Sequence, residues 1–169
     1  MAEAPVEIVP YDPSWPRLFE EERASLVRVI APWLAGPVEH IGSTAIPGVV
    51  AKPVIDIMAI VESLDASRPA LEVLAANDYC YAPYRAESEH WFCKPSPAFR
   101  THHLHLVPSG SPLLAEAIAF RDYLRAHADV ANEYADLKRR LAREHRLDRE
   151  AYTEAKTPFI QRVLACARP

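Results

Sequence analysis

The chain alternates between short apolar runs, typical of strands, and longer amphipathic stretches, typical of helices. Strand patterns occur at residues 6–9, 38–41, 53–61 and 100–107, and in the segments YCYAPY and HWFCK, which resemble a hairpin. Helical patterns cover residues 15–34, 67–76, 112–127, 130–145 and 149–167. Ser14, Asp129 and Asp148 stand where the N-cap residues of three of these helices are expected.

The order of these patterns predicts an α+β fold, because strands come early in the chain and helices come late. The sequence has 169 residues, half of them hydrophobic, which is enough for one globular domain with a core of its own. We therefore predict a single domain over residues 1–169, rich in sheet over 1–110 and helical over 111–169.

Composition and charge narrow the classes of function. A formal net charge of −4 argues against a protein whose main task is to bind nucleic-acid backbone. The charge is uneven, because residues 1–118 carry 8 Lys and Arg against 15 Asp and Glu, whereas residues 119–169 carry 11 against 8. The C-terminal third could supply cations to an anionic ligand, or its run KRRLAREHR is simply the solvated side of a helix.

No stretch of the chain carries a membrane or secretion signal. No apolar run approaches the roughly 18 residues of a membrane span, and MAEAPVEIVPYDP lacks the basic start and apolar centre of a signal peptide. The three cysteines are odd in number and form no CxxC pair, which fits reduced thiols. We therefore expect a cytoplasmic protein with no membrane partner.

A candidate phosphate-binding loop follows the strand at 38–41. Gly42 permits a tight turn, and the next two residues, Ser43 and Thr44, offer hydroxyls and amides to phosphate oxygens. The loop lacks the spacing and the Gly-Lys-Ser/Thr ending of a Walker A motif. Lys52 is close enough in sequence to reach the same anion, although it precedes a proline and its side chain could equally point to solvent.

Asp56 is a charged residue within the apolar strand VIDIMAIV, where it requires a partner, a metal or water. Strand alternation places Asp56 and Met58 on one face and Ile55 and Ile57 on the other. Asp56 either belongs to a functional site or pairs with a buried cation and organises the core.

The strand RTHHLHLV brings two histidines to one face, because His103 and His105 alternate with the core leucines Leu104 and Leu106. Two imidazoles on one strand face can share a metal or a phosphate, or they can form a satisfied hydrogen-bonding pair. On a strand beside Asp56, they would complete an Asp-plus-two-His set that suits Mn, Fe, Ni or Zn better than Mg.

The helical third repeats a pairing of aromatic and cationic residues at i,i+4 spacing, which places both side chains on one helix face. The pairs are Tyr134 with Lys138 and Tyr152 with Lys156, and the segment FRDYLR places Arg121 and Arg125 in the same relation. These residues either contribute to a shared pocket for an anionic ligand, or the aliphatic parts of their side chains simply pack over the core.

The motifs in combination resemble those of the GrpB-like proteins, a bacterial family placed in the nucleotidyltransferase superfamily. The resemblance extends from about Val6 to Ala165, and its segments are PYDPSWP, HIGSTAIPGVVAKPVIDI, HHLHL, FRDYLR, YADLK and YTEAKTPFI. It implies a nucleotidyltransferase-like mixed β-sheet with packed helices and a helical C-terminal part. The superfamily signature is Gly-Gly or Gly-Ser after a strand, followed by a pair of acids. Gly42, Ser43 and Asp56 match this signature, whereas Met58 occupies the second acidic position.

These observations lead us to expect a metal-dependent protein of nucleotidyltransferase type that binds a nucleotide or another phosphorylated small molecule, and that could transfer a nucleotidyl group. Its cofactors would be a divalent metal (Mn, Zn or Mg) and a nucleoside triphosphate. Asp56, His103 and His105 would be catalytic and hold the metal. The ligand-binding residues would be Gly42, Ser43, Thr44, Lys52, Arg121, Tyr134, Lys138, Tyr152 and Lys156. The alternatives are a non-catalytic nucleotide-binding or folding-assistance module, which Met58 favours, and a metal-dependent phosphohydrolase.

Overall fold

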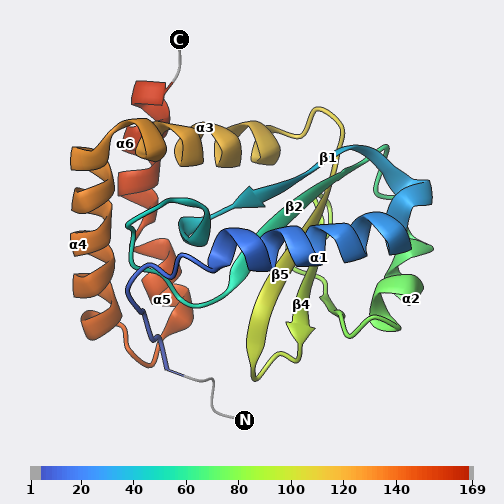
Figure 1. The fold of residues 1–169 in the computed structure, drawn as a ribbon, viewed down its shortest axis with the longest axis horizontal. Helices are drawn as coiled ribbons and strands as arrows, with labels where there is room; N and C mark the ends of the chain where they lie inside the picture. Colours follow the sequence, from blue (N-terminus) through green and yellow to red (C-terminus); the bar gives the residue numbers. More distant parts are fainter. Residues whose placement is uncertain (1–4, 168–169) are drawn as a thin grey trace.

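Five strands form one mixed sheet in the order β1-β2-β5-β4-β3. The structure, a computed structural model, describes residues 5–167 (Figure 1). The strands are β1 (Leu34–Ile41), β2 (Ile55–Val61), β3 (Cys80–Ala82), β4 (His90–Pro95) and β5 (Arg100–Pro108). Strands β2 and β5 are parallel, and the other neighbouring pairs are antiparallel. The predicted α+β class with a mixed sheet is confirmed, as is the hairpin, which is β3 paired with β4.

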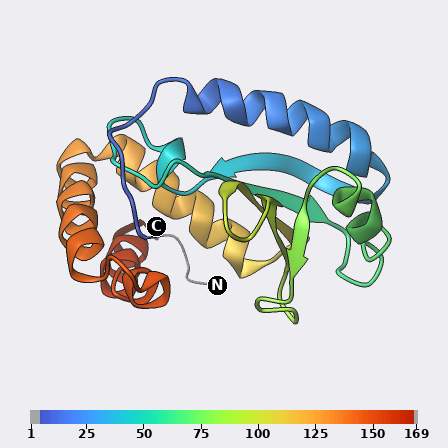
Figure 2. The same ribbon diagram turned by 90° about the horizontal axis from the view of Figure 1, so that it is seen from below.

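One face of the sheet is covered by α1 (Trp15–Ile30) and α2 (Ala70–Ala75), and Figure 2 shows α1 lying along it. Ile57 of β2 and Leu104 of β5 are fully buried on this face, where they belong to the same core cluster as Phe19 and Leu26 of α1. Because side chains alternate along a strand, the neighbours of Ile57 and Leu104 point to the opposite face.

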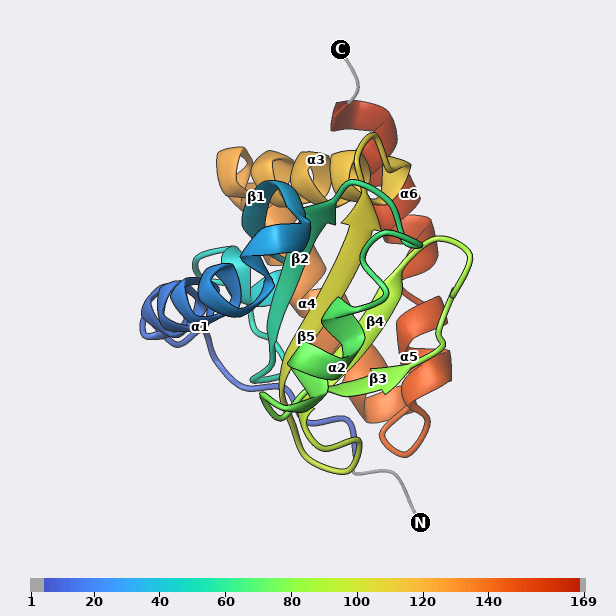
Figure 3. The ribbon, with the colours of Figure 1, turned by 90° about the vertical axis from the view of Figure 1, so that its right-hand side faces the viewer.

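The opposite face and one end of the sheet are covered by the helices that follow β5. These helices are α3 (Pro112–Ala126), α4 (Ala128–Glu144), α5 (Arg149–Glu154) and α6 (Thr157–Ala167). Met58 and Val107 pack beneath α3, on the side of the sheet away from α1 (Figures 2 and 3). Tyr134 of α4 and Phe159 of α6 pack with Ile46, which lies in the loop after β1. The helical third therefore lies against the loop at 42–50.

All of the described helices are short. The longest is α4, with 17 residues. Within residues 5–167, no helix is both long enough and apolar enough to cross a membrane.

The predicted strand at residues 6–9 is wrong, because only Val9 pairs, through an isolated bridge to Ala51. Pro10 follows directly and has no N–H to extend a ladder. Ser14 does stand at the N-cap of α1, although its side chain makes no capping hydrogen bond. The predicted N-cap at Asp129 is wrong, because α4 begins one residue before it. Asp148 does cap α5, where its side chain accepts a hydrogen bond from the backbone N–H of Ala151.

The stretch at 149–167 contains two helices and not the single helix that its pattern predicts. The break lies between Glu154 and Thr157, where α5 ends and α6 begins. Pro158 explains it, since a proline ring clashes with the carbonyl four residues earlier and is tolerated only in the first turn of a helix. The break places Lys156 in the connection between the two helices.

Candidate functional site

The loop after β1 passes directly over the carboxylate of β2. Ile41 is the register partner of Asp56, and Gly42 then leads into a single 3-10 turn, Ser43–Ala45. Gly42 has a φ of +71°, and a Cβ atom on it would lie 2.5 Å from Oδ2 of Asp56. Glycine is therefore required here by the backbone conformation and by the available space.

Asp56 and His103 form a hydrogen-bonded pair across the parallel strands β2 and β5. They are register partners, and Nδ1 of His103 lies 2.9 Å from Oδ1 of Asp56, to which it donates. Burial alone would raise the pKa of Asp56. The hydrogen bond from His103 and the electrostatic influence of His103, His105 and Lys156 outweigh this effect, so the pKa of Asp56 lies below its ordinary value. Asp56 is therefore an ionised carboxylate at neutral pH.

His105 lies on the same face, but it is bonded to a different carboxylate. Its Nδ1 hydrogen-bonds to Oε2 of Glu89, which is only 2% exposed. The sequence did not predict which residue Glu89 would contact. It showed only that Glu89 lies just before the strand segment HWFCK. Met58, the register partner of His105, is buried and packs beneath α3. The carboxylate that pairs with His105 is therefore that of Glu89.

The side chains of Asp56, His103 and His105 do not form a ligand set for a resident divalent metal. Nδ1 of each histidine is bonded to a carboxylate, which leaves only Nε2 as a possible metal donor, and Nε2 of His103 is buried with no hydrogen-bond partner. Within the described chain, no three or more His, Cys, Asp or Glu side chains are grouped to hold a metal ion. Two-metal transfer also needs carboxylates for both ions. As arranged, Asp56, His103 and His105 are not grouped around one ion, and the divalent metal stays a prediction.

Lys52 and Lys156 converge on the ring of Tyr152. Their Nζ atoms lie 4.6 Å and 4.5 Å from the ring centroid. Burial lowers the pKa of Lys52 to about 8, and the positive charges of Lys156 and Arg149 add to this effect. Burial also lowers the pKa of Lys156, against the opposing influence of Asp56. Both residues are partly exposed.

Lys138 of α4 belongs to the same group of charges, but it is buried. Its Nζ donates to the carbonyl oxygen of Val50 at 2.6 Å and lies 5.2 Å from the ring centroid of Tyr134. Burial lowers the pKa of Lys138, whereas Asp56 raises it. Burial raises the pKa of Tyr134 to about 12, despite a hydrogen bond with Ser43. Lys138 and Tyr134 thus anchor α4 to the loop at 42–50. We call Lys52, Lys138 and Lys156 the lysine cluster.

Thr44 and Arg121 are not part of this group, contrary to the assignment from the sequence. Thr44 is 1% exposed, and its hydroxyl lies 2.9 Å from Nε2 of His40. The guanidinium of Arg121 donates to the carboxylates of Glu39 and Asp122 and to the carbonyl of His40. Its role is to fasten α3 to β1. Helical spacing predicted the face on which Arg121 lies, but it could not predict these partners.

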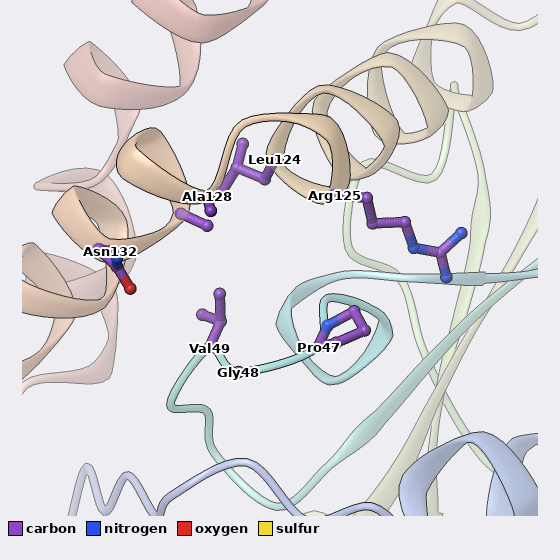
Figure 4. Close-up of a pocket in the computed structure, with 8 residues that line it drawn as sticks. Pro47, Gly48, Val49, Leu124, Arg125, Ala128 and Asn132 are labelled. Atoms are coloured by element: carbon purple, nitrogen blue, oxygen red, sulfur yellow. The ribbon is translucent and has the colours of Figure 1, made fainter.

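Two pockets border the helical part of the site. One of about 330 Å³ lies between the loop and the junction of α3 with α4 (Figure 4). Its lining residues are Pro47, Gly48, Val49, Leu124, Arg125, Ala128, Ala131 and Asn132. The other, of about 620 Å³, includes Lys156 and extends along α5 and α6. Only the second pocket is lined by a member of the lysine cluster.

Comparisons with known proteins give a consistent family. A family model described as "GrpB protein" matches residues 5–165. The UPF0157 protein YqkA of Bacillus subtilis is 36% identical over 156 residues, which cover 92% of this chain and 45% of that protein. The UPF0157 protein PA4798 of Pseudomonas aeruginosa is 38% identical over 170 residues, which cover 96% of this chain and 67% of that protein. The chain thus spans less than half the length of the B. subtilis relative.

A solved structure shows the same fold. The crystal structure of the conserved protein GrpB from Enterococcus faecalis superposes with a TM-score of 0.87 at 31% sequence identity. The match covers 95% of this chain and 96% of that one. The arrangement of sheet and helices described above is therefore shared with that protein over almost its full length.

Proposed function

The chain belongs to the GrpB protein family, and we propose that it binds a phosphorylated small molecule at the lysine cluster beside Asp56. The observation that carries this proposal is an excess of positive charge close to the carboxylate. Burial lowers the pKa of each of the three lysines and Asp56 raises it, while neighbouring cations lower the pKa of Lys52 and Lys138 further. Among the described residues, no lysine of the cluster forms an ion pair with a carboxylate.

Such an arrangement is unfavourable for the protein alone. Like charges that are partly removed from water repel one another and destabilise the folded state. A phosphate group on Lys52 and Lys156 would supply the missing negative charge, and charge-assisted hydrogen bonds to an ammonium are among the stronger ones. Strongly perturbed lysines in one region are also typical of functional sites.

Tyr152 supports the same location. Its side chain is 1% exposed, and its hydroxyl oxygen is buried with no hydrogen-bond partner. Buried polar groups without partners are rare in folded proteins and often mark a place where a ligand or ion belongs. The ring of Tyr152 contacts the ammonium groups of Lys52 and Lys156, so the unpaired hydroxyl belongs to the residue on which both lysines pack.

In this proposal, Asp56 acts on the lysines and not on a metal. Its negative charge keeps Lys52 and Lys156 protonated, and its contact with Gly42 sets the position of the loop. His103 holds the carboxylate by the hydrogen bond to Nδ1. The expectation that follows is phosphate binding that does not require a divalent ion.

Titration calorimetry with tripolyphosphate and with ATP, at low ionic strength, pH 7 and in excess EDTA, tests the proposal. We expect both ligands to bind the wild-type protein, and the double variant Lys52→Met/Lys156→Met to bind each at least tenfold more weakly. At 100 times its dissociation constant, a ligand should also stabilise the protein by about 2.7 kcal/mol, which is visible as a thermal shift.

Lys94→Met is the matched control. Lys94 pairs with Glu22 on the face of the sheet that α1 covers, so its loss should leave both affinities unchanged. The proposal fails if the wild-type protein binds neither ligand in EDTA, or if the double variant binds as tightly as the wild type.

A further inference from the structure

The pocket along α5 and α6 adjoins the lysine cluster, and of its lining residues only Lys156 takes part in the interactions described above. Its volume is about 620 Å³, which is within the range of roughly 300 to 1,000 Å³ found for small-molecule sites. Its lining residues are Arg85, Glu116, Thr153, Lys156, Thr157, Ile160, Gln161, Leu164 and Ala165. We call it the α5–α6 groove. Lys156 is the residue that it shares with the lysine cluster.

The lining of the groove combines an apolar strip with free polar groups. Ile160 and Leu164 stand four residues apart and therefore lie on one face of α6. Gln161 and Glu116 reach the groove from α6 and α3, and within residues 5–167 neither side chain makes a hydrogen bond or an ion pair. Such a lining suits a ligand whose organic part has apolar faces and polar edges.

The groove is long as well as large. From Thr157 to Leu164 the axis of α6 advances by about 10 Å, at 1.5 Å per residue. Lys156 precedes this stretch, at the junction of the two helices. A ligand with its phosphate on Lys156 could therefore lie along α6.

We propose that the α5–α6 groove holds the organic body of the phosphorylated ligand, and that this body is a nucleoside or a group of similar size and polarity. This inference rests on the proposed function, since it requires phosphate on Lys52 and Lys156. It adds that the natural ligand is an organic phosphate and not an inorganic one. Gln161 and Glu116 are then the residues that would distinguish one body from another, because they offer an amide and a carboxylate to its polar edge.

Competition between inorganic and organic phosphates tests this assignment. The affinities of ATP, GTP, CTP, UTP and tripolyphosphate are measured by calorimetry in EDTA for the wild type and for Ala165→Trp. Ala165 is exposed and lines the groove, so an indole there should fill it without disturbing the core. We expect at least one nucleotide to bind tenfold more tightly than tripolyphosphate, and Ala165→Trp to abolish that advantage while tripolyphosphate binding stays within twofold.

Ala115→Trp is the matched control, because Ala115 is an exposed alanine on α3 that does not line the groove. Gln161→Trp provides a second blocking variant if Ala165→Trp folds poorly. The inference is overturned if all four nucleotides bind no more tightly than tripolyphosphate, or if folded blocking variants keep the nucleotide advantage. Failure of every ligand to bind the wild type would instead overturn the proposed function, and this inference with it.

Discussion

Gly42 and Asp56 are in such close contact that a Cβ atom on Gly42 would lie 2.5 Å from Oδ2 and 3.1 Å from Cβ of the aspartate. The contact joins the loop after β1 to the strand that carries the carboxylate. A side chain at position 42 would therefore displace the loop, the carboxylate or both. The contact thus makes the position of the loop depend on that of Asp56.

Gly42→Ala should lower the free energy of unfolding by about 2 to 4 kcal/mol, because the alanine adds a steric clash to an unfavourable positive φ. Gly110→Ala is the control. Gly110 has a φ of +78°, but nothing lies within 4 Å of its added Cβ, so only the conformational cost of about 1 kcal/mol remains. Urea denaturation of both variants gives the two values. Equal losses would show that the contact with Asp56 is not close.

The variant Asp56→Asn distinguishes phosphate binding by the lysine cluster from phosphate binding through a metal ion. The substitution should lower stability by about 1 to 3 kcal/mol, because it weakens the bond to His103 and removes the charge that offsets the lysines. Tripolyphosphate affinity in EDTA should fall at pH 7, because without the charge of Asp56 the pKa of Lys52 and of Lys156 drops further, and it should recover at lower pH, where both lysines are protonated. Calorimetry with EDTA and with Mn²⁺ measures this directly. A large loss of affinity, seen only when Mn²⁺ is present, would favour metal-dependent binding.

Lys52→Met should stabilise the protein at pH 7. The pKa of Lys52 is about 8 in the folded protein, below its ordinary 10.5, so the unfolded chain binds more protons between these values. Wild-type stability therefore rises across this window. After discounting for partial exposure, removing the charge should gain about 2 kcal/mol, and losing the contact with Tyr152 should cost about 1 kcal/mol.

The pH dependence provides the check for Lys52→Met. The net gain of about 1 kcal/mol at pH 7 should shrink as the pH rises from 8 to 10.5, because the wild-type lysine loses its charge there. Denaturant titrations of both proteins at several pH values measure it. A pH-independent difference between them would show that the charge of Lys52 is not the cause.

Arg121→Met should destabilise the protein without affecting ligand binding. The guanidinium holds Glu39, Asp122 and the carbonyl of His40 together at the edge of β1, and its loss should cost about 2 kcal/mol. Tripolyphosphate affinity of the folded variant should remain within twofold of the wild type. Lys156→Met should behave in the opposite way, with weaker binding and little loss of stability. A tenfold loss of affinity in folded Arg121→Met would show that this arginine does contribute to the ligand site.

Much of the fold could be predicted from short-range patterns. Alternation in VIDIMAIV and RTHHLHLV correctly placed Asp56, His103 and His105 on one face, because the side-chain period of a strand is a local property. Helix spacing located α3 and α4 to within a few residues. Pro158 also carried the information that the last helix is broken, since the rule on prolines is local as well.

The rest of the site depends on contacts between residues that are far apart in the sequence. The parallel register of β2 and β5 is set by the order of the strands and by packing on both faces. It places Asp56 opposite His103 and could not be derived from either strand alone. The same limit applies to Glu89, which meets His105, and to Arg121, whose helical spacing suggested a ligand contact but whose distant partners, Glu39 and His40, lie on β1.

The sequence by itself therefore determined the class of fold, the faces of the strands and the residue types available to bind an anion. Only the tertiary structure decided which of these residues meet. Local spacing specifies the direction of each side chain, whereas its partner depends on how distant elements pack. For this reason the predicted metal ligands lie in two carboxylate–histidine pairs, and Lys52, from the loop before β2, meets Lys156 at the ring of Tyr152.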